Sequence, residues 1–474
     1  MHRALTCIDI LDEVFIWFDP ANFFGAFNCV DNDRTQTLAR SARVCKIFFQ
    51  PAIRVLWRRL ENAIIIFHTL PSLVQVRSDK RTQGGLPHPE YHIPEDVPAE
   101  EWERLSVYAV HVETLSASQG PSVREEEITQ DSWRTLRGHF HDKPIFPNLR
   151  DLFWLIDDDG PERIIPFLSP TIDWLSVSCS TPSWEFTPDR AQEWQRYLTV
   201  LIDELSTRIP GLRHLTLSTC ASIPSSFATS PLSKAPFIAL SALDLYNADS
   251  LQPSDLVALS RITSLEVLEL SVVDCQANLL HPARFDNLRD LRVYQQSATD
   301  RVFDIFTAPS LQRLDVRSFR VESTSDLRRM YALWARSFPA LQELVCTLDE
   351  HDAAGMEPCS ISSLVAPFCS IRDLRMLCLW LDTLPITIGD DDLSTFAEAW
   401  PSLETLIIQG SSDLAQEYYV VGLPGLIALT GKCPHLRDLR LSGVRVRSED
   451  VAQLPRDSPV NRFRYLLTGY STLS

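Results

Sequence analysis

The sequence predicts an α/β solenoid in which units of strand, turn and helix stack side by side, with an inner parallel sheet and outer helices. A short phrase with apolar residues at its first, fourth and sixth positions recurs eleven times, and proline often stands two residues before it. Between copies, the apolar residues change to helical spacing. One unit cannot bury its apolar face alone, so stacked neighbours must supply a continuous core.

The copies of the phrase are spread over most of the chain. Such loose spacing arises often by chance in a chain that is 45% hydrophobic, but seven copies carry the upstream proline, where random placement of the 31 prolines gives about 0.7. Steps of 23 to 40 residues between copies are typical of irregular leucine-rich repeats. The copies begin at Leu149, Ile172, Leu212, Leu240, Leu265, Leu288, Leu311, Leu341, Leu374, Leu403 and Leu436.

Each copy should form a strand, because apolar residues at alternate positions point to one side of an extended segment. Proline lacks the amide donor that continues a helix, so each upstream proline should end the element before it. Helices are expected most clearly around Leu198, Leu201, Ile202 and Leu205, and around Leu327, Met330, Tyr331, Trp334 and Phe338.

The first sixty residues follow a different pattern of three short amphipathic segments. The first runs up to Asp19, the second begins at Thr37, and Pro51 opens the third. Short helices with so many apolar residues make a poor independent core, so we expect them to form a docking surface. The apolar positions are Leu5, Ile8, Leu11, Val14, Phe15, Phe18, Leu38, Val44, Cys45, Phe48, Ile53, Leu56, Trp57 and Leu60.

These segments resemble a known family. Residues Ile8 to Phe18, followed by LARSARVCKIFFQPAIRVLWRRL from Leu38 to Leu60, look like the F-box of the large fungal set of F-box proteins with leucine-rich repeats. In that family a leucine-rich first helix is followed by a stretch of valine, cysteine and basic residues. The domain then ends with leucine, tryptophan and arginine. The segment EWERLSVYAVHVETL, from Glu101 to Leu115, resembles a stretch that these proteins place just before their repeats.

The resemblance implies a substrate-recruiting adaptor of a cullin-based, SCF-type ubiquitin ligase. Its F-box would bind a Skp-type adaptor on the cullin scaffold, and its repeats would bind a protein target of unknown identity. Two alternatives stay open: a repeat scaffold without ubiquitin-ligase association, whose helical head only caps the first repeat, and a hydrolase on an elongated α/β fold. The implied adaptor contacts are Leu11, Val14, Phe15, Val44, Cys45, Leu56 and Trp57.

The target-binding surface is expected on the variable positions of the strands, which neighbouring repeats bring together. Tyrosine, tryptophan and arginine are the residue types that most often anchor protein interfaces, and arginine pairs with carboxylates through two parallel hydrogen bonds. Any single one of these residues is more often an ordinary solvated strand residue. The set consists of Tyr246, Glu269, Asp290, Arg292, Tyr294, Asp315, Arg317 and Trp380.

The composition limits the classes of partner that the chain is expected to bind. A formal net charge of −18, from 62 acidic and 44 basic residues, opposes binding to nucleic acid or to an anionic membrane. The apolar run from Ala63 to Phe67 is too short to cross a bilayer, and acidic residues interrupt the amino-terminal segment where a secretory signal needs an apolar stretch. We therefore expect a cytoplasmic or nuclear protein with reduced cysteines.

We expect no enzymatic activity, no cofactor and no metal. The sequence has no nucleophile elbow, no phosphate-binding loop and no dinucleotide fingerprint. His88 and His92, with His111 as a distant third ligand, make only a weak metal site because no cysteine pair accompanies them. The acidic runs Asp157 to Asp159 and Asp390 to Asp392 precede helical segments, so helix capping explains them better than calcium binding.

Three regions follow from these patterns: an F-box-like helical domain at 1–60, a linker with irregular first repeats at 61–145, and a leucine-rich-repeat solenoid at 146–474. Two polar stretches, Arg77 to Ala99 and Gln119 to Asp131, read as insertions or linkers within the second region. A last strand near Tyr465 is expected to end the solenoid.

Overall fold

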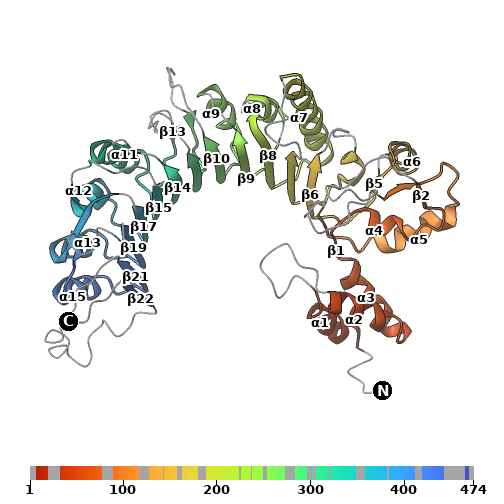
Figure 1. The fold of residues 1–474 in the computed structure, drawn as a ribbon, viewed down its shortest axis with the longest axis horizontal. Coiled ribbons are helices and arrows are strands. Elements are labelled where there is room, and N and C mark those ends of the chain that lie inside the picture. The colour runs from red at the N-terminus through yellow and green to blue at the C-terminus, as the bar shows by residue number, and fades with distance from the viewer. Residues whose placement is uncertain are drawn as a thin grey trace. The chain divides into compact units, whose positions relative to one another are not determined.

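The chain folds into two compact units, residues 1–220 with 234–240 (unit 1) and residues 221–233 with 241–474 (unit 2). Each unit contains a parallel sheet accompanied by helices (Figure 1). The structure, a computed structural model, describes residues 7–19, 32–76, 89–116, 127–141, 143–156, 163–179, 188–223, 226–235, 237–248, 253–272, 283–295, 303, 306–319, 321, 323–348, 358–381, 384–410, 419–441 and 465–468.

In unit 1 the parallel sheet runs in the order β1 (Arg59–Leu60), β4 (Thr114–Ser116), β6 (Asp151–Ile156), β7 (Trp174–Cys179) and β8 (His214–Ile223). A separate small sheet joins β2 (Val74–Val76), β3 (Glu90–His92) and β5 (Glu127–Ile128). After three amino-terminal helices, which are described below, this unit contains the helices α4 (Ile64–Phe67), α5 (Ala99–Ala109), α6 (Gln130–Phe140) and α7 (Pro188–Arg208).

In unit 2 successive strands pair in parallel from β9 (Ala242–Ala248) through β10 (Val267–Val272), β12 (Asp290–Gln295), β14 (Arg313–Phe319), β15 (Glu343–Leu348), β17 (Met376–Leu381), β19 (Thr405–Gly410) and β21 (Asp438–Leu441) to β22 (Tyr465–Thr468). Figure 1 shows the helices of this unit along one side of the sheet. They include α8 (Ser226–Lys234), α9 (Pro253–Leu259), α11 (Thr324–Ser337), α12 (Ile361–Val365), α13 (Asp390–Ala399) and α15 (Leu423–Lys432).

Two minor sheets also belong to unit 2. One pairs β11 (Ala283–Arg284) with β13 (Phe306–Thr307), and the other joins β16 (Cys359–Ser360), β18 (Ile386–Gly389) and β20 (Tyr419–Val420). The predicted solenoid of leucine-rich repeats is confirmed, because all eleven copies of the phrase lead into strands of the parallel sheets. The final strand predicted near Tyr465 is β22.

The prolines upstream of the phrase stand in tight turns, as expected. Helices α7, α11, α13 and α15 each end two residues before such a proline, at Arg208, Ser337, Ala399 and Lys432. In all seven proline copies the amide of the first apolar residue donates to the carbonyl three residues earlier, at 3.1 to 3.3 Å. Proline therefore occupies the second position of a four-residue turn, where its fixed backbone angle is favourable.

The core consists of rows of aliphatic residues that repeat from strand to strand. Leu344, Leu377 and Leu406 are aligned across β15, β17 and β19, and all three are fully buried. The predicted helices complete this core: α7 buries Leu198, Leu201, Ile202 and Leu205, and α11 buries Leu327, Met330, Tyr331 and Trp334.

The acidic run at the start of α13 caps helices, which confirms the prediction for Asp390 to Asp392. The Asp392 carboxylate accepts a hydrogen bond from the Gly389 amide at 2.8 Å. Asp390 accepts one at 2.7 Å from the amide of Gly422, which precedes α15. Gly425 must lack a side chain, because a Cβ there would lie 2.5 Å from the Asp390 carboxylate. The run Asp157 to Asp159 lies outside the described residues.

The three predicted amino-terminal helices are present as α1 (Ile8–Ile16), α2 (Asn32–Ala42) and α3 (Lys46–Trp57), which together we call the head. The prediction that Pro51 opens the third helix is wrong, because α3 begins at Lys46 and Pro51 lies inside it. Burial of Pro51 with its neighbours Ala52 and Ile53 outweighs the loss of one backbone hydrogen bond.

Candidate functional site

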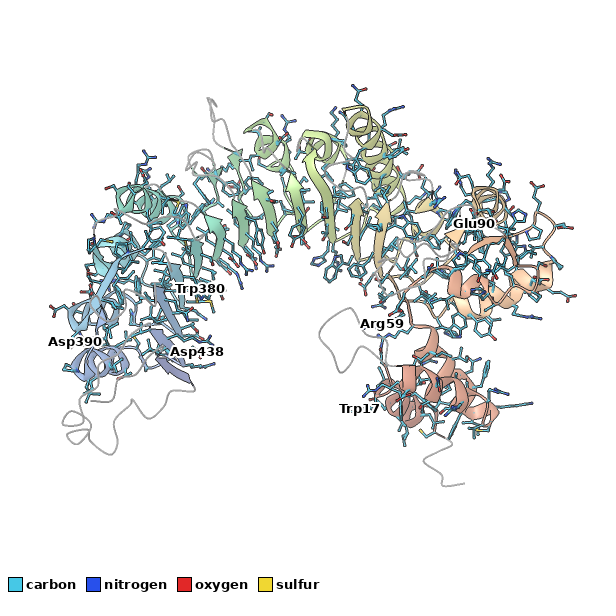
Figure 2. The ribbon with its side chains drawn as sticks, viewed as in Figure 1. Trp17, Arg59, Glu90, Trp380, Asp390 and Asp438 are labelled. Atoms are coloured by element: carbon cyan, nitrogen blue, oxygen red, sulfur yellow. The ribbon has the colours of Figure 1, made fainter. Side chains whose placement is uncertain are left out.

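In unit 2 the strands present rows of side chains on the side of the sheet opposite the helices, which we call the strand face. Figure 2 shows Trp380 and Asp438 on this side and Asp390 on the helix side. Residues two apart along a strand share the face, and the parallel register aligns them between neighbouring strands. The central row is Asp244, Glu269, Arg292, Asp315, Val345, Cys378, Ile407 and Arg440.

The part of the strand face on β9, β10 and β12 is a linked set of charged and tyrosine side chains. Glu269 is buried and accepts hydrogen bonds from the Tyr246 hydroxyl and, at 3.4 Å, from Arg292 Nη1. Arg292 also donates to Asp290 at 2.9 Å. Burial, together with the Glu269 carboxylate, raises the pKa of Tyr246 and of Tyr294, so both hydroxyls keep their protons at neutral pH.

A second buried carboxylate organises β14. The Asp315 side chain is 1% exposed and accepts two hydrogen bonds from Arg317, at 3.0 and 2.9 Å. These bonds raise the pKa of Arg317, whose guanidinium lies 5.6 Å from the centre of the Tyr294 ring. Arg313 lies between Asp315 and Glu343, with nitrogen to oxygen distances of 3.7 and 3.3 Å. Because buried charges must be paired, these contacts hold the arginines and tyrosines in fixed positions.

On β15, β17 and β19 the central row of the strand face is apolar, whereas Glu343 at the start of β15 belongs to the charged part beside Arg313 on β14. Val345, Cys378 and Ile407 pack together as a buried cluster in the central row, with Met376 and Trp380 half-buried against them. Burial raises the pKa of the Cys378 thiol to about 12, so this cysteine stays neutral and behaves as a small apolar side chain. The strand face therefore changes from charged to apolar between β14 and β15.

The predicted target-binding residues divide between these two parts. Seven of them, from Tyr246 to Arg317, form the charged set on β9 to β14, whereas Trp380 lies in the apolar part. Glu269 and Asp315 are buried and hold the exposed side chains in place, and their direct contact with a target stays a prediction. The sequence reasoning missed Val345, Cys378 and Ile407. Their signal was an apolar residue at the fifth position of the phrase in three successive copies, where seven of the other eight copies are polar.

The head has its own core and also exposes apolar side chains. Leu11 and Phe15 are buried in that core, because they face α2 and α3 from one side of α1. Contact of these two residues with an adaptor therefore stays a prediction, for side chains that are buried in this structure. Ile10 and Val14 on α1 and Trp17 directly after its last residue, spaced by four and three residues, form a second stripe that is exposed, with Trp17 66% accessible. We call these three residues the α1 stripe.

The other predicted adaptor contacts differ in exposure. Val44 is 67% exposed in the turn before α3, and Cys45 is partly exposed at the start of that helix. Leu56 and Trp57 pack against the head core, and the Trp57 ring lies 4.9 Å from that of Tyr108 on α5. Of the predicted set, Val14 and Val44 are thus the most accessible. Sequence reasoning missed Ile10 and Trp17, although their helical spacing from Val14 was visible.

The described residues contain no cluster of three or more histidine, cysteine, aspartate or glutamate side chains arranged to hold a metal. His92 lies 3.1 Å from the Thr129 hydroxyl in a cap of α6, and His88 lies outside the described residues. Within the described part of the chain, no helix combines the length and the apolar character needed to cross a bilayer.

Comparison with known proteins adds little to this geometry. No protein-family model matches the sequence, and no curated protein matches it significantly. Similar solved structures include an internalin from Listeria monocytogenes (14% identity, 67% of this chain and 78% of that chain, TM-score 0.34) and the leucine-rich-repeat protein LegL7 from Legionella pneumophila (13%, 69% and 92%, 0.35). A further match is the Rad7 and Elc1 complex of yeast (12%, 87% and 92%, 0.35). Similarities this low carry no conclusion about function.

Proposed function

We propose that the chain is a substrate-recruiting adaptor of a cullin-based ubiquitin ligase, with residues 1–60 as an F-box-like domain. The exposed α1 stripe carries this proposal. A helix that only capped the repeats would bury its apolar residues on one face, and α1 already does so with Leu11 and Phe15. A second, exposed apolar stripe on the same short helix has no structural task in the described chain and suits a partner helix or groove.

In this proposal the chain performs no chemistry of its own. It binds a Skp-type adaptor through the α1 stripe and Val44, and it holds a protein target on the repeats. Tethering the target beside a charged conjugating enzyme converts a bimolecular encounter into an effectively intramolecular one, which raises the local concentration of acceptor lysines. The linker and first repeats at 61–145 and the solenoid at 146–474 would then hold the two partners on one chain.

The decisive experiment is co-expression of the full chain with a Skp-type adaptor, followed by gel filtration. Leu11→Asp is a poor test because Leu11 is a core residue whose replacement unfolds the head. Val14→Asp places a charge on a side chain that is 44% exposed, so it should abolish co-elution and leave the helix content unchanged. Val200→Asp on α7, where the valine is 47% exposed, is the matched control and should co-elute normally.

The proposal fails if the adaptor and the wild-type chain elute separately, which would favour the plain repeat scaffold. It also fails if both valine variants weaken co-elution equally, because the effect would then come from added charge and not from a defined surface. Circular dichroism of both variants establishes that each remains folded.

A further inference from the structure

The strand face of unit 2 has two chemically distinct parts that adjoin between β14 and β15. At the strand-face positions of β9 to β15 there are five carboxylates, two of them buried, and three arginines. The apolar cluster begins at Val345 on β15, beside Asp315 on β14. A partner that covers both parts must therefore present two kinds of side chain.

The charge of the first part favours a cationic partner. Each of the three arginines already contacts at least one carboxylate of the same set: Arg292 contacts Asp290, Arg317 contacts Asp315, and Arg313 contacts Glu343. An anionic group would have to compete with these internal carboxylates for the same donors. The five carboxylates exceed the arginines by two, so lysine or arginine residues complement this part, and the net charge of −18 attracts them from a distance.

The charged part also has the residue types that hold cationic side chains in place. The Tyr246 and Tyr294 rings lie 6.2 Å apart, the Tyr246 hydroxyl donates to Glu269, and the Tyr294 ring already lies close to one guanidinium, that of Arg317. Aromatic faces attract ammonium and guanidinium groups, most strongly where carboxylates are near. Because the rings are fixed before binding, little side-chain freedom is lost.

The distance between the charged part and the apolar part of the strand face sets the length of the partner segment that contacts both. Neighbouring strands lie about 4.8 Å apart, so the three steps from β12 to β17 span about 14 Å. An extended peptide covers that distance with about four residues, at about 3.3 Å each. A short segment of one chain can therefore reach from Tyr294 to Trp380.

We propose that the strand face binds an extended protein segment with lysine or arginine over β9 to β14 and Glu343 at the start of β15, and with an aliphatic or aromatic residue about four positions away, over the apolar cluster of β15 to β19. This inference rests on the proposed function in that it takes the repeats as the part that holds the target. It names the chemistry of the recognition sequence, with Asp244, Asp290 and Glu343 facing the basic residues and Trp380 and Met376 facing the apolar one.

The test uses the purified full chain without any adaptor and two immobilised libraries of ten-residue peptides. One library carries two adjacent lysines at fixed positions, the other carries two glutamates there, and all remaining positions are degenerate. The chain should retain the lysine library and enrich leucine, isoleucine, phenylalanine or tryptophan about four positions from the lysines. Equal or stronger retention of the glutamate library, or enrichment that ignores this spacing, overturns the inference.

Variants separate the two parts. Glu343→Gln should weaken binding of a selected lysine peptide about threefold to fivefold at low salt, since an exposed charge pair is lost. Trp380→Ala should weaken it about tenfold or more and remove the apolar preference. Glu398→Gln, on the helix side at α13, is the matched control and should bind as the wild type does. Equal effects of Glu343→Gln and Glu398→Gln count against a defined site.

Failure of this inference is distinguishable from failure of the proposed function. If the adaptor co-elutes with the chain but the lysine library is not retained, only the proposed recognition sequence is wrong. If the lysine library is retained and the adaptor does not bind, the strand face is a peptide-binding surface of a scaffold outside any ubiquitin ligase.

Discussion

The repeats and the head bury their apolar residues in different ways. In the repeats, one phrase and one turn recur, so that Leu344, Leu377 and Leu406 occupy equivalent and fully buried positions. In the head, each helix occurs once, and α1 carries one buried apolar stripe beside one exposed stripe. Because the repeats recur, the sequence predicts which of their residues are buried. For a single helix with two apolar stripes, the sequence does not show which stripe is buried and which is exposed.

The largest expected contrast is between two tryptophans. Trp400 is fully buried in the repeats and its indole donates to the Phe368 carbonyl at 3.1 Å, so Trp400→Ala should lower the free energy of local unfolding by about 3 to 5 kcal/mol. Trp17→Ala in the head should change it by less than about 0.5 kcal/mol. Hydrogen exchange, followed peptide by peptide around each site, measures both. Similar losses at the two sites would show that Trp17 belongs to a core.

Substitutions in the two stripes of α1 should also differ in their effect on stability, with the larger loss in the buried stripe. Leu11→Ala removes a buried side chain and should destabilise the head by about 2 to 4 kcal/mol. Val14→Ala should leave its stability within about 0.5 kcal/mol. Limited proteolysis between α1 and α3 reports on this, with Val200→Ala as the exposed control. If Val14→Ala accelerates cleavage as much as Leu11→Ala does, the α1 stripe is structural.

Replacing each of two prolines by alanine should change the free energy of unfolding in opposite directions. Pro401 fits a turn, so Pro401→Ala should cost about 0.5 to 1 kcal/mol through the greater freedom of the unfolded chain. Pro51 lies inside α3, where proline is unfavourable by about 3 kcal/mol relative to alanine, so Pro51→Ala should stabilise the head despite a small loss of packing. Thermal unfolding monitored by circular dichroism gives both values. Destabilisation by Pro51→Ala would mean that its ring is essential to the head core.

The smallest effect concerns the apolar part of the strand face. Burial raises the pKa of Cys378 to about 12, so the folded state favours the neutral thiol and loses stability as the pH rises from the ordinary thiol range towards 12. At pH 8 a maleimide should therefore label Cys378 slowly in the folded chain and rapidly in urea. Rapid labelling of the native chain at Cys378 would contradict a closely packed apolar cluster.

Much of the repeat region is predictable from the sequence, because the phrase, the proline and the helical spacing agree with one another. The start of α3 is not, since Pro51 favoured a boundary that packing of Ala52 and Ile53 overrides. The strand face is predictable as a set of positions but not in its contacts. Burial of Glu269 and Asp315 depends on their neighbours in other repeats, and the sequence of one strand contains no information about them.

We propose two separate binding surfaces, the α1 stripe for the adaptor and the strand face for the target. Hydroxyl-radical footprinting of the full chain, with and without a Skp-type adaptor, tests this directly because it reports the accessibility of individual side chains. We predict that the adaptor lowers oxidation of Trp17 and leaves that of Trp380 unchanged. Protection of Trp380 with no change at Trp17 would contradict binding of the adaptor at the α1 stripe.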